Sequence, residues 1–540
     1  MRGRSLVAIL GVAGAGALAV AVAVWFVGRL PETATVVVNI PDNPAALAAT
    51  EAQEAEVVAA LPNAADEMPA EDAAPPEPSG PQPVFIADAV RAQMSNPALR
   101  AGAHPDDIAA VETFYTGHTG PALWVTDAGF TPQAQAIIAE IAKADDWGLE
   151  SSAFAPPPAD FQPADAGQQA AAELALDLAI LKYARYARGG RANPSALSKI
   201  VDQTPPLRNP ATVLTEIAAA PEPDAYLRDL HPKHEHFERL RQALVKARAN
   251  SAKQEDVTRI LINMERWRWM PENLGSLYVW LNTPEFMMYV VKDGKPIHSA
   301  KIVVGKVRYA TPVFTANMTT IVFNPEWTVP PTIVREDLLP KLRGGGGLFS
   351  SNTAILKQHG LRVKYNGRPV DPGGIDWKSV NMAAISFHQA PGPTNVLGKV
   401  KFVYPNKHIV YMHDTIKRDL LNKTVRAEGH NCPRVDNPGK VAAVLLAEDK
   451  GWPTSKVEEL LAKGHDASVS LDRQIPVHTT YFTAVADADG KVRTFADLYG
   501  LDRAVGNAII GKGAAVNAVA GAPPSPLPKP NAGSVATTVP

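Results

Sequence analysis

The hydrophobic periodicity of the chain changes near residue 270, and this change predicts two folded domains of different class. Before it, apolar residues recur at helical spacing, as Leu174, Leu178 and Leu181 do within ELALDLAILKYARYARGG, where Gly189 supplies a stop signal. After it, short runs rich in β-branched and aromatic residues alternate with turn residues, which is typical of strands. The strand-like runs are LYVWL, FMMYVV, KIVVG, TTIVF and HIVYMH.

We therefore predict an α-helical domain over residues 83–270 and a mostly β domain of the α+β class over residues 271–505. Within the second domain, Asp293-Gly294 is a tight-turn pair between two of the runs. The domain is expected to close with a helix that starts near Pro438 and a hairpin that turns at Asp489-Gly490.

The N-terminus has the pattern of a membrane anchor. Arg2 and Arg4 precede an apolar run from Leu6 to Val27, close to the roughly 20 residues that a membrane-spanning helix needs. Because a cleaved signal peptide has a shorter apolar region of about 7–15 residues, we expect an uncleaved anchor over residues 1–30. Its Ala-rich second half leaves cleavage open as the alternative. The basic residues place the short N-terminal end in the cytoplasm and the rest of the chain outside.

Two segments have compositions typical of unfolded chain. Residues 31–82 are crowded with Ala, Pro and Glu, and they contain too few large apolar groups to offset the entropy of ordering. We expect a disordered linker there. Residues 506–540 are biased in the same way, and we expect a disordered tail.

Charge and cysteine content exclude some classes of function. The formal net charge is −2, from 53 Lys and Arg against 55 Asp and Glu, so no charge excess indicates a nucleic-acid partner. A single cysteine excludes an intrachain disulfide. The cluster HPKHEH, with His231, His234 and His236, lacks an accompanying ligand set of the usual spacing. We expect it to be a solvated helix start, and we expect neither a metal nor a cofactor.

The only cysteine, Cys432, lies in the stretch GHNCPR, with His430 two residues before it and Arg434 two residues after it. Asp436 or Asn437 can cap a helix that follows directly. The partial positive charge of that helix terminus, the arginine and an imidazole would all stabilise a thiolate, the form that attacks a carbonyl carbon. This pattern predicts a cysteine that is reactive at neutral pH.

Acyl transfer also needs a base and oxyanion donors. His413 ends the predicted strand HIVYMH, with 15 residues between it and Gly429, and we take it as the base. The backbone amides of Asn431 and Cys432 are the expected oxyanion donors. Taken alone, however, the residues leave open a second interpretation, in which the lone cysteine is a small buried hydrophobe.

The segment HIVYMHDTIKRDLLNKTVRAEGHNCPRVDNP resembles the signature of the YkuD-type L,D-transpeptidase catalytic domain. That signature is a His, some 14–17 residues, then Ser or Thr, His, Gly, Cys, and an Arg two places on. The stretches ERWRWMP, VGKVRYATPVF, FNPEWTVPPTI, PGPTNVLGKVKF and PVHTTYFTA also resemble large, membrane-anchored members. FYTGHTGPALWV and LKYARYARGGR are similar to their helical scaffold domain, so the resemblance covers roughly residues 84–505.

The resemblance implies that Cys432 is the acylated nucleophile and His413 the general base. His430 would line the site, and Arg434 would bind a substrate carboxylate. Residues 324–392, which contain the run GGGG, would form a lid over the donor stem. The implied reaction joins peptidoglycan stems by 3→3 cross-links, with release of D-Ala from a tetrapeptide donor.

Five further residues have two possible roles each. We include Tyr411 and Asn395 among the substrate-binding residues, with a core position for Tyr411 and a turn position for Asn395 as alternatives. We expect Trp267 and Trp269, in RWRW, to pack at the domain junction rather than to stack on a sugar. His478 is expected to be a packed strand residue rather than a second base.

The motif departs from the family pattern at Gly429, Asn431 and Pro433, which stand in place of a Ser or Thr, a Gly and an aliphatic residue. Asn tolerates left-handed backbone angles better than most residues, so the loop geometry is expected to survive. Two alternatives to cross-linking stay open. One is a hydrolase of the same fold, and the other is a catalytically silent peptidoglycan-binding protein.

The resemblance and the N-terminus together predict a single-pass protein of the bacterial inner membrane, with its catalytic domain in the periplasm. Its expected partners are peptidoglycan stem peptides, namely a donor tetrapeptide and an acceptor stem amine, and the membrane itself. No nucleic acid is expected among them.

Overall fold

The computed structural model describes residues 22–23, 37–38, 81–344 and 353–511, and the chain forms two compact units, Met1–Glu77 and Pro78–Pro540. In the first unit, strands β1 (Val22–Ala23) and β2 (Val37–Val38) pair antiparallel. The rest of the predicted anchor (residues 1–30), most of the linker (31–82) and Gly345 to Gly347 of the GGGG run lie outside the described residues. Among the described residues, no helix has the length and apolarity to cross a membrane.

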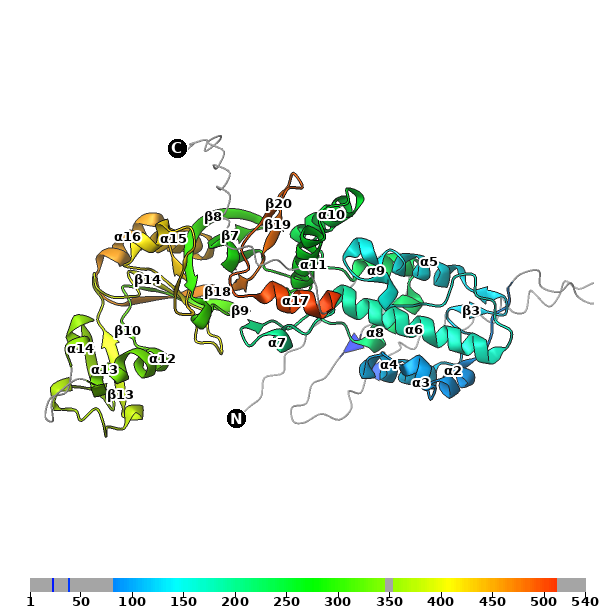
Figure 1. Ribbon diagram of the computed structural model, residues 1–540, viewed down its shortest axis with the longest axis horizontal. Helices are drawn as coiled ribbons and strands as arrows, with labels where there is room; N and C mark the ends of the chain where they lie inside the picture. The colour runs from blue at the N-terminus through cyan, green and yellow to red at the C-terminus, as the bar shows by residue number, and fades with distance from the viewer. Residues whose placement is uncertain (1–21, 24–36, 39–80, 345–352, 512–540) are drawn as a thin grey trace, which may run out of the picture. The chain divides into compact units, whose positions relative to one another are not determined.

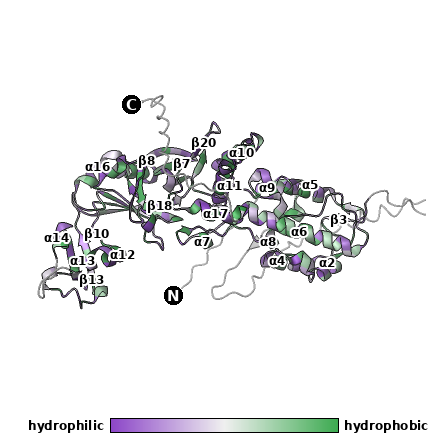
Figure 2. Ribbon diagram, in the orientation of Figure 1, coloured by the Kyte–Doolittle hydropathy of each residue, from purple (hydrophilic) through white to green (hydrophobic). Residues whose placement is uncertain are grey.

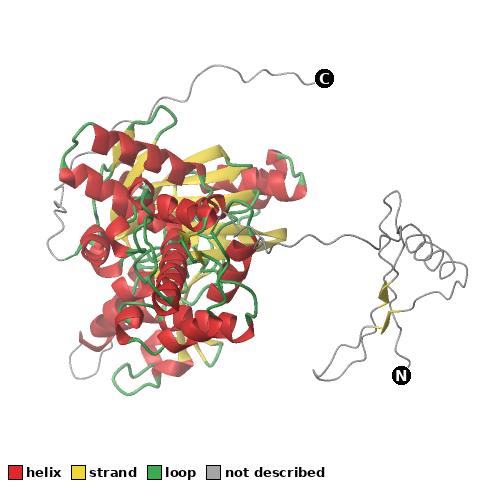
Figure 3. Ribbon diagram, turned by 90° about the vertical axis from the view of Figure 1, so that its right-hand side faces the viewer, coloured by secondary structure: helices red, strands yellow, loops and turns green. Residues whose placement is uncertain are grey.

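The helical domain is built around α6 (Ala166–Gly189), whose buried residues run along most of its length. Figure 1 shows α6 with other scaffold helices on both sides, and in Figure 3 it is seen nearly end-on among them. Hydrophobic and hydrophilic residues alternate along these helices (Figure 2), as amphipathic packing requires. The helices are α2 (Ala87–Gln93), α4 (Pro105–Gly117), α5 (Pro132–Ile141), α8 (Pro210–Ala219) and α9 (Pro223–Asp229).

Two carboxylates inside this domain explain part of the stretch FYTGHTGPALWV. Glu173 accepts hydrogen bonds from the Tyr115 hydroxyl (2.7 Å) and from the backbone amides of Leu123 (2.6 Å) and Trp124 (2.9 Å). Asp177, one turn later, accepts from the Trp124 indole at 2.7 Å. Burial raises the pKa of both carboxyl groups. The stretch therefore supplies the hydrogen bonds that the two buried carboxylates of α6 need, which is a structural role.

The β domain predicted over residues 271–505 is built on a ten-stranded sheet that closes on itself, because β14 pairs with both β15 and β9. The predicted strands LYVWL, FMMYVV, KIVVG and TTIVF are confirmed, and the turn residues Asp293 and Gly294 both have positive φ. The main strands are β6 (Leu277–Asn282), β7 (Met287–Lys292), β8 (Lys295–Gly305), β9 (Val313–Phe323), β14 (Val400–Val403), β15 (Met412–His413), β17 (Arg434–Val435) and β18 (Ala467–Thr480).

The predicted strand HIVYMH is wrong over most of its length, because only Met412 and His413 are in a strand. The Asn406 side chain bends the chain before them. Its amide donates to the carbonyls of Tyr404 (2.6 Å) and Val410 (2.7 Å), and its oxygen accepts from the amide of His408 (3.0 Å). This side chain thus replaces the sheet hydrogen bonds of the segment.

The expected lid, residues 324–392, contains a small sheet and short helices with their own apolar core. Figure 1 shows β10 and β13 beside α13 and α14. The elements are β10 (Trp327–Thr328), α12 (Pro331–Ile333), a π-helical turn η5 (Val334–Leu338), α13 (Leu339–Gly344), α14 (Ala354–Gln358), β11 (Leu361–Tyr365), β12 (Arg368–Val370) and β13 (Ile385–Gln389).

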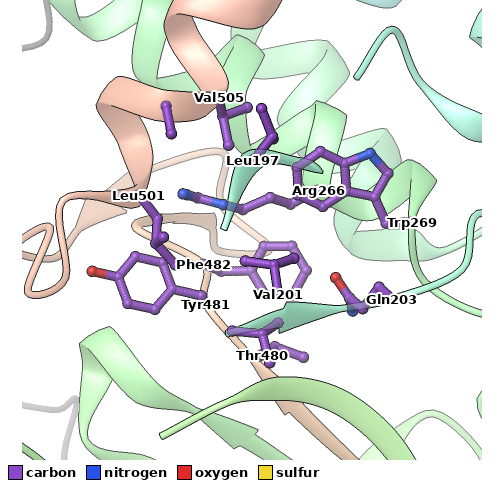
Figure 4. Close-up of a pocket in the computed structure, with 12 residues that line it drawn as sticks. Leu197, Val201, Gln203, Arg266, Trp269, Thr480, Tyr481, Phe482, Leu501 and Val505 are labelled. Carbon is purple, nitrogen blue, oxygen red and sulfur yellow. The ribbon is translucent and has the colours of Figure 1, made fainter. Parts of the chain in front are cut away.

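Helices α10 (Glu235–Ala249) and α11 (Gln254–Arg268) share one core with the catalytic domain. Trp267 is buried and stacks on Phe482 with ring centroids 4.5 Å apart, so the predicted packing role of the RWRW aromatics is confirmed. Buried Arg266 binds Asp502 of α17 (Leu501–Ile510) at 2.6 Å. Figure 4 shows Arg266 and Val505 beside a space of about 10 Å³ at this junction.

Two expectations near this junction need correction. The tail was predicted to begin at residue 506, but α17 continues to Ile510 because Val505 and Ile509, one turn apart, are both buried. The HPKHEH histidines are packed rather than solvated. His231 is buried and stacks on Trp147, and His236 stacks on Trp267.

The helical domain also contributes a strand to the catalytic sheet. β5 (Val201–Asp202) pairs parallel with β9, and Asp202 binds Lys407 at 2.6 Å and His408 at 2.8 Å. These contacts connect the helical domain to the segment that leads into His413.

Candidate active site

The sheet places the predicted base next to the GHNCPR stretch. In β15, His413 is paired with Lys401 of β14 on one side and with Arg434 of β17 on the other. Its backbone amide donates to the carbonyl of Pro433 at 3.1 Å. His413 and Cys432 therefore lie on neighbouring segments, although 18 residues separate them in the sequence.

Cys432 directly precedes β17, is partly exposed and packs against the core of the catalytic domain. Burial of the thiol raises its pKa from about 9 to about 11. The backbone N–H of Tyr411, the Lys401 ammonium and the Arg434 guanidinium oppose this shift. At neutral pH the resting group is a thiol.

This finding corrects the expectation of a thiolate stabilised by a helix terminus. β17 lies between Cys432 and helix α15 (Pro438–Lys450), so the cysteine is six residues from the first residue of the helix. Pro438 does begin the helix as predicted, but Asn437 has φ 44° and its side chain caps no backbone amide. The helix dipole acts within about one turn, and desolvation of the thiol outweighs it here.

His413 is buried, with 7% of its surface exposed. Burial and the charge of Arg434 lower its pKa to about 3, although the backbone carbonyl of Asp414 acts in the opposite direction. The imidazole is therefore neutral at pH 7, which a general base requires. Its Nδ1 has no hydrogen-bond partner among the described residues.

Two cations flank the thiol, and the sequence interpretation named only one of them. Arg434 is half-buried and forms no ion pair with a described residue, so its guanidinium is free to bind a substrate carboxylate. Lys401 was not predicted. Its Nζ lies 4.2 Å from the ring centroid of Tyr411, and its charge stabilises the thiolate of Cys432. Cross-strand pairing with His413 is what brings Lys401 here, and the sequence alone carries no signal for that pairing.

Asp414 is a second residue that the sequence interpretation missed. Its carboxylate accepts from the backbone amides of Lys399 (2.8 Å) and Thr415 (2.7 Å), and it binds Arg418 at 2.6 Å. At Gly398, where φ is +61°, a Cβ would lie 2.4 Å from this carboxylate, so only glycine allows the approach. Asp414, the residue after His413, thereby holds the loop before β14 in place.

The oxyanion prediction is correct for at most one of its two donors. The backbone amide of Asn431 already donates to the carbonyl of Tyr309 at 3.0 Å, so it does not point to a reacting carbonyl. Its side-chain amide donates to the Ala310 carbonyl at 3.0 Å. The backbone amide of Cys432 makes no hydrogen bond to a described residue, and it is the donor that remains.

The structure also gives reasons for two departures from the family pattern. Asn431 has φ 25°, and its side chain bonds the neighbouring loop, so the left-handed geometry survives as expected. At Gly429, in β16 (Ala427–Gly429), a Cβ would approach the Val304 carbonyl to 3.0 Å. Glycine allows this close pairing with β8.

His430 connects the site to the lid segment. Its ring stacks on Tyr309 with centroids 4.1 Å apart, and the Tyr309 hydroxyl donates to Glu336 of η5 at 2.5 Å. Tyr411 also faces the lid, because it packs against the lid core and its hydroxyl meets Trp327. Its ring centroid is 5.7 Å from that of His413. These contacts connect both residues to the segment 324–392, and they connect Tyr411 also to His413.

Asn395 does not line the site, which corrects its assignment to substrate binding. It is fully buried, and its amide donates to the carbonyls of Pro325 (2.9 Å), Gln389 (3.2 Å) and Ala390 (3.0 Å). His478 is packed as expected, with its ring nitrogens bonded to Thr315 and to the Leu274 carbonyl, each at 3.0 Å. Both residues have structural roles.

Comparison with known proteins agrees with this geometry. Residues 276–450 match the family described as the L,D-transpeptidase catalytic domain, and residues 109–244 match the Scaffold domain. A protein of Haemophilus influenzae named "Putative L,D-transpeptidase" is 31% identical over 258 residues, which are 47% of this chain and 50% of that protein. The chain thus spans about half the length of this relative. Two regions of the chain therefore match known families, a Scaffold domain and, after it, a YkuD-type L,D-transpeptidase catalytic domain.

Proposed function

We propose that the protein forms 3→3 cross-links between peptidoglycan stem peptides through an acyl intermediate on Cys432. The observation that carries this proposal is the arrangement of Cys432 beside a strand that holds neutral His413, with Lys401 and Arg434 as nearby cations. A nucleophile, a base that can accept its proton and groups for a carboxylate are the parts that acyl transfer from an anionic peptide needs.

In the first step, His413 accepts the thiol proton while Sγ attacks the carbonyl carbon between the L-centre of diaminopimelate and the terminal D-Ala. The Cys432 amide donates to the developing oxyanion. Collapse breaks the peptide bond, the imidazolium returns the proton to the leaving amine, and D-Ala departs. A thioester remains on Cys432.

In the second step, the amine of another stem attacks the thioester carbonyl. His413 takes a proton from that amine and returns it to Sγ, so the thiol is regenerated and one amide bond forms. Because the resting thiol and imidazole are both neutral, charge separates only as attack occurs. Lys401 and Arg434 then stabilise the sulfur as its negative charge develops.

The same proposal places the protein in the inner membrane, with the catalytic domain in the periplasm. Its support is the apolar run after Arg2 and Arg4. A reporter fused to the C-terminus tests this placement. Activity of a reporter that works only in the cytoplasm would contradict it.

Two observations favour a second candidate, a catalytically silent wall-binding protein. The raised pKa of Cys432 and the Asn431 amide already bonded to Tyr309 both reduce reactivity. A hydrolase of the same fold is the third possibility, in which water replaces the acceptor amine.

Incubation of the full-length protein with a disaccharide-tetrapeptide distinguishes the three. Intact-protein and product masses are recorded, with Cys432→Ala as the control. We expect a Cys432-dependent acyl adduct, loss of D-Ala and a dimeric product. An adduct with only trimmed stems would identify a hydrolase. No adduct, under conditions where an active relative forms one, would refute catalysis.

A further inference from the structure

A cavity of about 710 Å³ lies in the helical domain and includes no residue of the candidate active site. We call it the scaffold cleft. It is enclosed by the C-terminal half of α6, the loop after α6, the start of α4 and the segment that follows β5. Its volume is within the range of about 300–1,000 Å³ typical of ligand sites. The residues that define its chemistry are Lys182, Arg185, Tyr186, Arg191, Asn193 and Thr204.

One face of α6 forms the main wall of the cleft. Lys182, Arg185, Tyr186 and Gly189 follow one another at spacings of three, one and three residues, so they share a stripe on the helix. At Gly189 a Cβ would come within 2.2 Å of the Leu207 side chain. Glycine therefore lets the opposite wall approach the end of the helix.

The cleft has an excess of positive charge. Lys182, Arg185 and Arg191 are its cations, and Asp107 is the only carboxylate among the described residues that line it; Glu150, outside the lining, lies 3.7 Å from Arg191. Arg185 already pairs with buried Asp107, so that pair is internally neutral. Lys182 forms no ion pair with a described residue. Its Nζ lies 5.9 Å from the ring centroid of Tyr186.

Two hydrogen-bond donors in the cleft lack acceptors in the described part of the chain. The Arg191 side chain is 9% exposed, and its Nε has no partner there. The hydroxyl of Tyr186 makes no hydrogen bond to those residues either. Buried donors are costly when unpaired, so a ligand that supplies acceptors suits this cavity.

We propose that the scaffold cleft binds a carboxylate-bearing segment of peptidoglycan, away from Cys432. This inference rests on the proposed function for the class of ligand. A carboxylate matches Lys182 and Arg191, and sugar hydroxyls and peptide amides match Tyr186, Asn193 and Thr204. The cleft would hold a wall strand while the catalytic domain acts on a stem.

The position of the cleft fits this role. Its wall formed by Gln203 and Thr204 directly follows β5, which pairs with β9 of the catalytic sheet. Asp202 of β5 binds Lys407 and His408, a few residues before His413. A peptidoglycan strand bound in the cleft is thus connected, through β5 and its ion pairs, to the segment that carries His413.

Charge reversal at Lys182 tests the proposal. The full-length protein carrying Cys432→Ala, which prevents covalent capture, is sedimented with purified sacculi, with and without Lys182→Glu. Loss of a charge-assisted hydrogen bond predicts roughly tenfold weaker binding. The matched control is Lys246→Glu, an exposed lysine of α10 outside the cleft, which should leave binding unchanged. Thermal unfolding verifies that each variant is folded, and Lys182→Met replaces Lys182→Glu if the latter is not.

Three results would overturn the inference. In the first, the Lys182 variants bind sacculi as tightly as the protein without them. In the second, Lys182→Glu and Lys246→Glu weaken sacculus binding equally. In the third, Lys182→Glu weakens binding to anionic lipid vesicles but not to sacculi. Amidation of the sacculus carboxylates should remove the difference in sacculus binding between the Cys432→Ala proteins with and without Lys182→Glu. A protein that forms no acyl adduct but shows Lys182-dependent sacculus binding would refute the proposed catalysis and support the cleft.

Discussion

The raised pKa of the Cys432 thiol predicts how its alkylation rate depends on pH. Burial disfavours the charged thiolate, so the pKa rises from about 9 to about 11. At pH 7 the thiolate fraction is then about 10⁻⁴, whereas a thiol of pKa 9 would have about 10⁻², a hundredfold difference. Because the thiolate is the nucleophile, the rate should rise about tenfold per pH unit until about pH 11.

Intact mass spectrometry after brief exposure to iodoacetamide measures this rate directly. Cys432 is the only cysteine, so every carbamidomethyl adduct on a thiol reports on it. Glutathione in the same buffers is the control, and its rate should level off near its own, lower pKa. Comparison of the two pH profiles, rather than of absolute rates, removes the effect of steric access.

A plateau of the Cys432 profile below about pH 9 would refute this electrostatic account of the site. It would show that the Tyr411 amide, Lys401 and Arg434 outweigh desolvation in the free protein. A second measurement, with a bound acyl donor, tests whether substrate changes the balance. The mechanism above needs the thiolate only as attack begins.

Three other perturbations have distinct expected results. Lys401→Met removes a cation that stabilises the thiolate of Cys432, so alkylation of Cys432 at pH 8 should slow by about threefold to tenfold. Lys401→Arg keeps the charge, and its rate should stay near that of the native protein. Equal rates in all three proteins would contradict a role of Lys401 in stabilising the thiolate. Asn431→Gly removes the hydrogen bond to the neighbouring loop and should lower the free energy of unfolding by about 1 kcal/mol in urea titrations, and a more stable variant would show that the bond contributes nothing. Asp502→Ala leaves buried Arg266 without its ion-pair partner, so it should lower the free energy of unfolding in urea titrations by about 3–5 kcal/mol. Glu448→Ala breaks a partly exposed ion pair with Lys292 and should lower it by less than about 1 kcal/mol. Equal losses would contradict the buried-charge explanation.

The sequence predicted elements that depend on local pattern and missed features that depend on distant contacts. Periodicity located α6, α10 and most strands, since apolar spacing records the buried face of each element. The segment HIVYMH failed because a single side chain, Asn406, satisfies the backbone that a strand would have paired. Propensity alone carries no information about such a bond.

The site shows the same division. Cys432, His413 and Arg434 were identified from their motif, and the sheet does bring their segments together. The direction of the thiol pKa was predicted wrongly, because desolvation depends on packing that no spacing reveals. Lys401 of β14 and Tyr309, in the turn between β8 and β9, lie outside the motif. The pairing of β14 with β15 brings Lys401 beside His413, and the Tyr309 carbonyl accepts from the Asn431 amide.

Closure of the main sheet has a consequence for the lifetime of the site. The strand that holds His413, β15, has β14 and β17 as neighbours. Since β14 also pairs with β9 and β17 also pairs with β8, neither neighbour is a free edge that can fray. Local opening of a protein begins at weakly held edges and loops. Separation of His413 from Cys432 then requires disruption of several ladders together. The backbone amide of His413, which donates to Pro433, should therefore exchange with deuterium only about as fast as the whole domain unfolds.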